Sequence, residues 1–259
     1  MLRRVFGELI SNANVTGNIY DMRVAERYIS EAARPGQFVN IYMPRADLLL
    51  PRPLSVCETY ADEGAFRIIY QAMGEGTNLL ASLKPGDKMR MTGPAGNGFV
   101  TGDEKRIMIA GGGIGVPPLL ALARKLKNEN AELSIFLGFK NAGLAVLEDE
   151  FLNVTGRVYV STDDGSAGFN GFITEHMRAR EAAADVIYAC GPLAMLKSVA
   201  GYAAEINASC YVSMEERMAC GIGACVGCAV KIKKEGSFTY KKVCSDGPVF
   251  GAGEVCWDG

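Results

Sequence analysis

Four cysteines near the C-terminal end constrain this chain more than any other feature of its sequence. Cys220, Cys225 and Cys228 lie in one glycine-rich loop, and Cys244 follows after fifteen intervening residues. The gaps of four, two and fifteen residues form the C-x4-C-x2-C…C arrangement of a plant-type 2Fe-2S cluster. A structural zinc site is the alternative, although zinc more often uses two C-x2-C pairs.

Upstream of this loop, the pattern of the sequence changes near residue 102. Residues 1–102 carry short alternating runs, such as 38–42 and 66–70, separated by glycine-rich turns. This pattern predicts an antiparallel β barrel. From 103 to 212, strand-like and helix-like segments alternate, which predicts a doubly wound parallel sheet of the α/β class. Residues 213–259 are too few for a core of their own, so we expect a small module folded around its metal centre.

Composition excludes several classes of function. The formal net charge is −2, so no basic field is available to hold nucleic acid or an anionic membrane surface. The single histidine, His176, excludes a multi-histidine metal site, and no catalytic acid or base is assigned. No stretch reaches the roughly 18 apolar residues of a membrane helix, and no secretory signal is evident. We therefore expect a cytoplasmic protein with reduced cysteines.

A glycine-rich turn follows the first strand-like segment of the second domain. Gly111, Gly112, Gly113 and Gly115 come directly after the run RIMIA and lead into a helix that opens with two prolines. Such a turn presents free N–H groups and the positive end of the helix dipole to a pyrophosphate. It departs from the G-x-G-x-x-G fingerprint, and no acidic residue ends the next strand, which argues against a Rossmann dehydrogenase.

A second segment supports a ligand at the same edge of the sheet. Cys190 and Gly191 end a later predicted strand, and crevices in such sheets open at the carboxyl ends of the strands. The alternative is a tight strand–helix turn that binds nothing.

Two segments of the predicted barrel are candidate phosphate sites. Residues 52–55 read Arg-Pro-Leu-Ser, and residues 74–77 read Gly-Glu-Gly-Thr. An arginine can pair with a phosphate through two hydrogen bonds, while hydroxyls and glycine amides satisfy the remaining oxygens. Each segment alone is equally compatible with a surface turn. Five lysines between residues 231 and 242 are interpreted as the solvated face of a hairpin, with a docking rim as the alternative.

The order of these motifs resembles the ferredoxin-NADP reductase superfamily. Within it, the run 214–225, MEERMACGIGAC, and the tail 244–250, CSDGPVF, resemble the electron transfer subunits of class B dihydroorotate dehydrogenase. The resemblance covers nearly the whole chain. A subunit of electron-bifurcating NADH-dependent ferredoxin:NADP oxidoreductase shares the domain order and has to be distinguished.

The resemblance implies FAD in the barrel, NAD at the sheet domain and a 2Fe-2S cluster on the four cysteines. Leu54 stands where the superfamily usually has the tyrosine of R-x-Y-S, a residue that commonly flanks the isoalloxazine. The implied FAD residues are Arg52, Pro53, Leu54, Ser55, Ile69, Tyr70, Gln71, Gly76 and Thr77. The implied NAD residues are Gly111, Gly112, Gly113, Gly115, Cys190 and Gly191. The implied cluster ligands are Cys220, Cys225, Cys228 and Cys244.

The activity implied by the resemblance is an electron relay in pyrimidine biosynthesis. Dihydroorotate is oxidised at the FMN of a separate catalytic subunit, and electrons pass through the cluster and FAD to NAD. We expect a heterotetramer with two copies of each subunit, and only dye-reductase activity from this chain alone. Two other classes stay open: a flavin or ferredoxin-type reductase that acts alone or with another partner, and a zinc-stabilised nucleotide-binding regulator.

Overall fold

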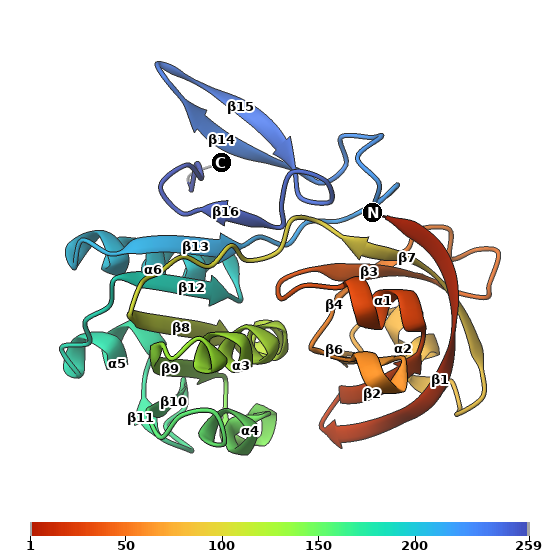
Figure 1. Ribbon diagram of the computed structural model, residues 1–259, viewed down its shortest axis with the longest axis horizontal. Helices are drawn as coiled ribbons and strands as arrows, with labels where there is room; N and C mark the ends of the chain where they lie inside the picture. Colours follow the sequence, from red (N-terminus) through yellow and green to blue (C-terminus); the bar gives the residue numbers. More distant parts are fainter. Residues whose placement is uncertain (1, 258–259) are drawn as a thin grey trace. The chain divides into compact units, whose positions relative to one another are not determined.

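The computed structural model describes residues 2–257, which divide into two compact units (Figure 1). The C-terminal segment contributes to both of them. The first unit contains the residues up to Gly98, Glu215–Val230 and Tyr240–Pro248, and the second contains Phe99–Met214, Lys231–Thr239 and the residues from Val249 onward.

The first unit is built on a seven-stranded antiparallel sheet with the order β4-β3-β7-β1-β2-β6-β5. The sheet curls into an open barrel (Figure 1), which confirms the antiparallel architecture predicted from the alternating runs. Two helices, α1 (Arg27–Ala32) and α2 (Glu75–Ser82), connect its strands. The strands are β1 (Arg3–Thr16), β2 (Ile19–Ala25), β3 (Phe38–Tyr42), β4 (Arg52–Ser55), β5 (Glu58–Tyr60), β6 (Ala65–Gln71) and β7 (Lys88–Ala95).

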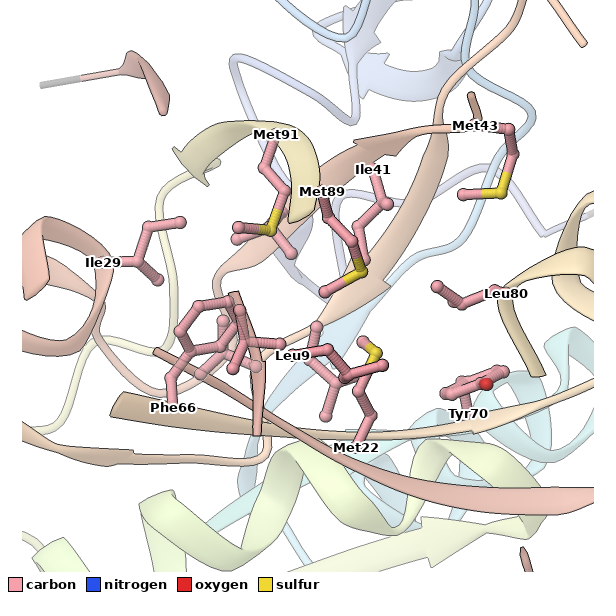
Figure 2. Close-up of a cluster of buried hydrophobic side chains, with 14 residues drawn as sticks. Leu9, Met22, Ile29, Ile41, Met43, Phe66, Tyr70, Leu80, Met89 and Met91 are labelled. Atoms are coloured by element: carbon pink, nitrogen blue, oxygen red, sulfur yellow. The ribbon is translucent and has the colours of Figure 1, made fainter. Parts of the chain in front are cut away.

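The barrel core collects the inward-facing side chains of these strands (Figure 2). Successive side chains of a strand point to opposite faces, so Val39 and Ile41 of β3 enter the core while Asn40 faces away from it. Burying each large apolar side chain contributes about 1.5 to 3 kcal/mol. The cluster comprises Leu9, Met22, Val24, Ile29, Val39, Ile41, Met43, Val56, Phe66, Ile68, Tyr70, Leu80, Met89 and Met91. The barrel strands and helices therefore supply their own core without the cysteine loop.

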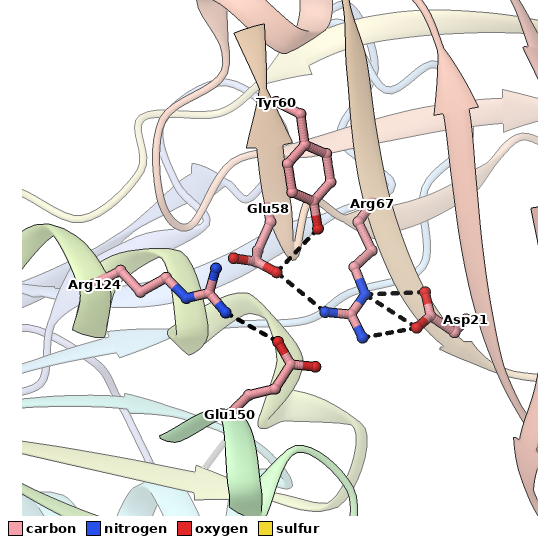
Figure 3. A network of polar contacts seen from close by, with 6 residues as sticks. All are labelled: Asp21, Glu58, Tyr60, Arg67, Arg124 and Glu150. Atoms are coloured by element: carbon pink, nitrogen blue, oxygen red, sulfur yellow. Dashed lines mark hydrogen bonds and ion pairs between the residues drawn. The ribbon is translucent and has the colours of Figure 1, made fainter. Parts of the chain in front are cut away.

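A partly buried ion network connects β2, β5 and β6 (Figure 3). The Arg67 guanidinium lies 2.7 Å from Asp21 Oδ2 and 3.1 Å from Glu58 Oε2, and the Tyr60 hydroxyl donates to the same Glu58 oxygen. Glu58 is only 4% exposed. Because removing one partner of a buried ion pair leaves an uncompensated charge, loss of the Arg67 side chain would destabilise the packing of these three strands.

The second unit contains a seven-stranded sheet with the order β11-β10-β9-β8-β12-β13-β16. All pairs are parallel except the last, in which β16 runs antiparallel to β13. From β8 the chain proceeds to β9, β10 and β11 on one side, and then returns to β12 and β13 on the other, so the strand order reverses between β8 and β12. The strands are β8 (Arg106–Gly112), β9 (Glu132–Phe139), β10 (Val158–Thr162), β11 (Phe169–Asn170), β12 (Val186–Cys190), β13 (Ser209–Ser213) and β16 (Val249–Gly251).

Helices cover both faces of this sheet, as right-handed crossovers require when the strand order reverses. Helix α3 (Leu120–Asn128) packs with α4 (Glu148–Leu152), and Arg124 of α3 pairs with Glu150 of α4 at 3.0 Å (Figure 3). Helix α5 (Ile173–Ala179) packs with α6 (Leu193–Glu205). This arrangement confirms the predicted doubly wound sheet.

The remaining regular elements are a hairpin and four 3-10 turns. The hairpin pairs β14 (Ala229–Lys234) with β15 (Ser237–Lys242). The 3-10 turns are η1 (Ala61–Glu63), η2 (Gly113–Gly115), η3 (Pro117–Leu119) and η4 (Ala142–Leu144). None of the helices between residues 2 and 257 has the length and apolar character needed to cross a membrane.

Candidate cofactor sites

The cysteine loop directs backbone N–H groups at its sulfur atoms. Cys220 Sγ accepts from the N–H groups of Ile222 and Cys225, at N···S distances of 3.5 and 3.3 Å. Cys244 Sγ accepts from the N–H of Gly223 at 3.1 Å. Hydrogen bonds of this kind stabilise a thiolate, and those from Ile222 and Cys225 lower the pKa of Cys220 to about 6.

The four thiols differ in burial. Cys228 and Cys244 are buried, whereas Cys220 and Cys225 are half-buried. Burial, together with the hydrogen bond to Cys228, raises the pKa of Cys244 to about 11. Among residues 2–257, no three His, Cys, Asp or Glu side chains lie close enough together to hold a single metal ion. A 2Fe-2S cluster does not require this arrangement, because each of its two irons takes two of the four thiolates.

Glycine and lysine shape the backbone of this loop. Gly221 and Gly223 have φ values of +64° and +81°, a region that L side chains rarely adopt. The Lys242 ammonium donates to the carbonyl of Gly223 at 2.6 Å. Lys242, one of the lysines interpreted as a solvated face, therefore anchors the loop and places its positive charge at the Gly223 carbonyl.

The structure brings the two candidate phosphate segments of the barrel together. Arg52 begins β4 and Gly76 lies in the first turn of α2. A Cβ added to Gly76 would lie 2.0 Å from Arg52 Nε and 2.2 Å from Cζ, so the guanidinium rests directly against the glycine backbone. Arg52 Nη1 also donates to the carbonyl of Leu50 at 2.5 Å. A positive group at a helix N-terminus is suited to bind a pyrophosphate.

The hydroxyl of Thr77 shapes the same turn. Thr77 Oγ1 accepts from the N–H groups of Met73 and Gly74 at 3.0 and 3.1 Å, and donates to the carbonyl of Gly74. The hydroxyl is thus already engaged. The N–H groups in the first turn of α2, which have no acceptor within the helix, are the groups that this segment can offer to an anion.

The other predicted FAD residues divide between the core and the opposite face. The Tyr70 side chain lies in the barrel core (Figure 2), and its hydroxyl donates to Asn12 Oδ1 at 3.1 Å. Ile69 and Gln71 alternate with Tyr70 and face away from the core. Leu54, which stands where the superfamily has a tyrosine, is half-buried against the core. Strand β4, which carries Arg52, Pro53, Leu54 and Ser55, lies against β6.

The predicted NAD segments meet at the carboxyl ends of β8 and β12. Cys190 pairs with Gly111 across these neighbouring strands. A Cβ on Gly115 would lie 2.6 Å from the carbonyl carbon of Cys190 and from Gly191 Cα. Only glycine permits this close approach. Because the strand order reverses between β8 and β12, the two segments border the crevice in which open α/β sheets bind their ligands.

Two residues that contact the cysteine loop are not indicated by the sequence alone. Lys242 is one of the five lysines that the sequence indicates as a solvated face, yet it donates to the Gly223 carbonyl. Asn40 sits between apolar neighbours in β3, yet it is fully buried and donates to the carbonyl of Gly221 in the cysteine loop at 3.3 Å. The feature of the sequence that could have indicated this contact is a single asparagine within the apolar run 38–42.

Residues 215–256 match the model of the iron-sulfur cluster binding domain of dihydroorotate dehydrogenase B, and residues 8–99 match the oxidoreductase FAD-binding domain. A dihydroorotate dehydrogenase B (NAD(+)) electron transfer subunit from Geobacillus kaustophilus is 43% identical over 260 residues, which cover 98% of this chain and 99% of the relative. The chain belongs to the family of dihydroorotate dehydrogenase B electron transfer subunits.

Other relatives agree with this family. The electron transfer subunit of Caldanaerobacter subterraneus subsp. tengcongensis is 42% identical, over 95% of this chain and 96% of its own length. A solved structure of an NADH-dependent reduced ferredoxin-NADP oxidoreductase, studied for flavin-based electron bifurcation, superposes with a TM-score of 0.88 at 30% identity and covers 97% of this chain and 90% of that one. Flavohemoglobin from Malassezia yamatoensis (TM-score 0.67, 23% identity, 79% of this chain and 57% of that one) shares the fold. The iron-sulfur match favours the predicted cluster over zinc.

Proposed function

We propose that this chain carries electrons between a partner subunit that oxidises dihydroorotate and NAD, through a 2Fe-2S cluster and FAD. The observation that carries the proposal is that the cysteine loop and Arg52, the residue proposed to bind the FAD pyrophosphate, belong to the same compact unit. Bound FAD and a bound cluster supply the exchange between single electrons and a hydride. The residues of the chain hold these groups and set their surroundings.

Cys220, Cys225, Cys228 and Cys244 are the proposed cluster ligands. The N–H groups that already point at Cys220 and Cys244 fit a thiolate-held group, because such hydrogen bonds compensate the negative charge on sulfur and tune its reduction potential. The ammonium of Lys242 adds a positive charge at the same loop.

Arg52 and the first turn of α2 are proposed to hold the FAD pyrophosphate. The guanidinium compensates the charge of the phosphates, and the N–H groups of Gly76 and Thr77 donate to their oxygens. Ser55 and the outward-facing Ile69 and Gln71 are the groups that β4 and β6 offer to the rest of the flavin.

In the second unit, Gly111–Gly115 and Cys190–Gly191 are proposed to hold NAD. Helix α6 begins at Leu193, directly after this segment, so its unbonded N–H groups face the crevice at the strand ends. Gly115 allows the two loops to pack closely, and Gly113 leaves open space beside the backbone, since a Cβ there would meet nothing within 4 Å.

The partner is an FMN-containing catalytic subunit, and we propose a cytoplasmic heterotetramer with two copies of each chain. The curated relatives are themselves electron transfer subunits by name. This chain alone should pass electrons from NADH to dyes, but it should not oxidise dihydroorotate.

The test measures dihydroorotate-dependent NAD reduction with each subunit alone and with the mixture. We expect activity only in the mixture. The Cys225→Ser variant is the matched control, since it should keep NADH-to-dye activity with two-electron acceptors and lose coupling to dihydroorotate. Dihydroorotate oxidation by this chain alone, or no gain on mixing with an active partner, would refute the proposal and favour a reductase with another partner.

A further inference from the structure

Asn40 is a polar side chain that the fold buries completely. It is 0% exposed, and it occupies the face of β3 that points away from the apolar core. Its Nδ2 donates to the carbonyl of Gly221 at 3.3 Å, while its Oδ1 is buried and has no hydrogen-bond partner among the described residues. Burying an amide with an unsatisfied acceptor costs free energy, so an apolar residue here would cost less.

The surroundings of Asn40 connect two proposed cofactor sites. Across the sheet, Asn40 is opposite Pro53 of β4, within the segment that begins with Arg52. On its other side, its amide lies against Gly221, which directly follows Cys220. A Cβ added to Gly221 would lie 2.4 Å from Asn40 Nδ2 and 2.8 Å from Cγ, so the two residues are in close contact.

We propose that Asn40 is a positioning residue that fixes Cys220 relative to the flavin-binding strand β4. The inference rests on the proposed function, because it requires a cluster on Cys220. Asn40 holds the carbonyl of the Gly221–Ile222 peptide, and the N–H of that same peptide donates to Cys220 Sγ, so Asn40 restrains the loop around this sulfur. Hydrogen bonds around the ligands, together with ligand orientation, set the potential of an iron–sulfur cluster. Through this restraint on the loop, Asn40 affects electron exchange between the cluster and FAD.

The test uses two substitutions of different character. Asn40→Leu keeps a similar volume and removes the donor, and Asn40→Asp keeps the shape and replaces the donor by an acceptor. Ile41→Val is the matched control: it loosens the same strand on the core side and leaves the Gly221 contact intact. Iron and FAD contents are measured for each full-length protein, followed by the EPR spectrum of the reduced cluster.

Stopped-flow mixing with NADH then separates flavin reduction from the later reduction of the cluster. In both Asn40 variants, we expect unchanged flavin reduction, altered cluster g values, and cluster reduction slowed by about tenfold, the lower end of the roughly 10- to 100-fold losses of activity that follow removal of an outer-shell partner. The Ile41→Val protein should melt at a lower temperature with wild-type spectrum and rates. If the Asn40→Leu protein assembles no cluster, the EPR spectrum and the rate of cluster reduction are taken from Asn40→Asp.

The outcomes separate the two proposals. A wild-type EPR spectrum of the reduced cluster and wild-type reduction rates in both Asn40 variants would overturn the role of Asn40 and leave the proposed function intact. Equal changes in Ile41→Val would also overturn it, since they would reflect loss of stability. The absence of a reduced-cluster signal in the wild-type protein would overturn the proposed function.

Discussion

The contact between Arg52 and Gly76 allows the flavin site to be tested by a substitution that displaces the Arg52 guanidinium and keeps the N–H of Gly76. In Gly76→Ala, the new Cβ would lie 2.0 Å from Arg52 Nε and 2.3 Å from Nη2. The guanidinium is the far end of a flexible side chain, so it moves aside at little cost. Gly76 lies within α2, where alanine is favoured over glycine by about 0.5 to 1 kcal/mol. The flavin-free protein should therefore be as stable as the wild type, or slightly more stable.

The affinity for FAD should change in the opposite direction. A charge-assisted contact between Arg52 and the pyrophosphate is worth about 1.5 to 3 kcal/mol, so Arg52→Ala should raise the Kd for FAD by roughly ten- to hundredfold. Gly76→Ala pushes the Arg52 guanidinium away from its position and should therefore raise the Kd for FAD by about the same factor. In the double variant there is no side chain left to displace. The loss should then match Arg52→Ala alone, which corresponds to a coupling of about 1.5 to 3 kcal/mol between the two residues.

The assay is a titration of flavin-stripped protein with FAD, followed by quenching of flavin fluorescence, with the melting temperature of each stripped protein measured alongside. Gly201→Ala is the matched control. It is a glycine-to-alanine change in helix α6 whose new Cβ meets nothing within 4 Å, so it should stabilise the fold similarly and leave the Kd for FAD unchanged. An unchanged Kd in Gly76→Ala, or losses that multiply in the double variant, would refute the placement of the pyrophosphate at Arg52.

Two further predictions concern the cysteine loop and the single histidine. Cys225→Ser and Cys228→Ser should each lose the EPR signal of the reduced cluster while retaining FAD, because the barrel core excludes this loop; wild-type iron content and signal in both would contradict the ligand set. Burial, and then the charge of Arg180, lower the pKa of His176, so the neutral form is favoured in the folded state. The stabilisation is present above the ordinary pKa of about 6.5 and is lost as the pH falls through 6.5 toward the lowered value. The melting temperature should therefore fall between pH 7.5 and 5.5 by more in the wild type than in His176→Phe, and equal falls would contradict this reasoning.

The sequence by itself determined the features that depend on neighbours along the chain. The spacing of Cys220, Cys225 and Cys228 specifies a loop that can surround a cluster. The period-two pattern at 38–42 places Val39 and Ile41 on one face of a strand, and the structure confirms that this face is the core. The glycine turn after RIMIA indicated the carboxyl end of a parallel strand, because local backbone preferences and periodicity are encoded within a few residues.

The tertiary structure alone decided which remote groups meet. Alternation predicts only that Asn40 faces away from the core; its burial depends on a loop 181 residues away that covers it. Likewise, nothing local shows that the Arg52 guanidinium rests on Gly76, or that the Thr77 hydroxyl is engaged within its own turn. The strand β16 joins the second sheet by pairing with β13, although the sequence placed it in a separate module. A polar side chain or an unpaired sheet edge can be satisfied by many partners, and only the packing of the whole chain selects one of them.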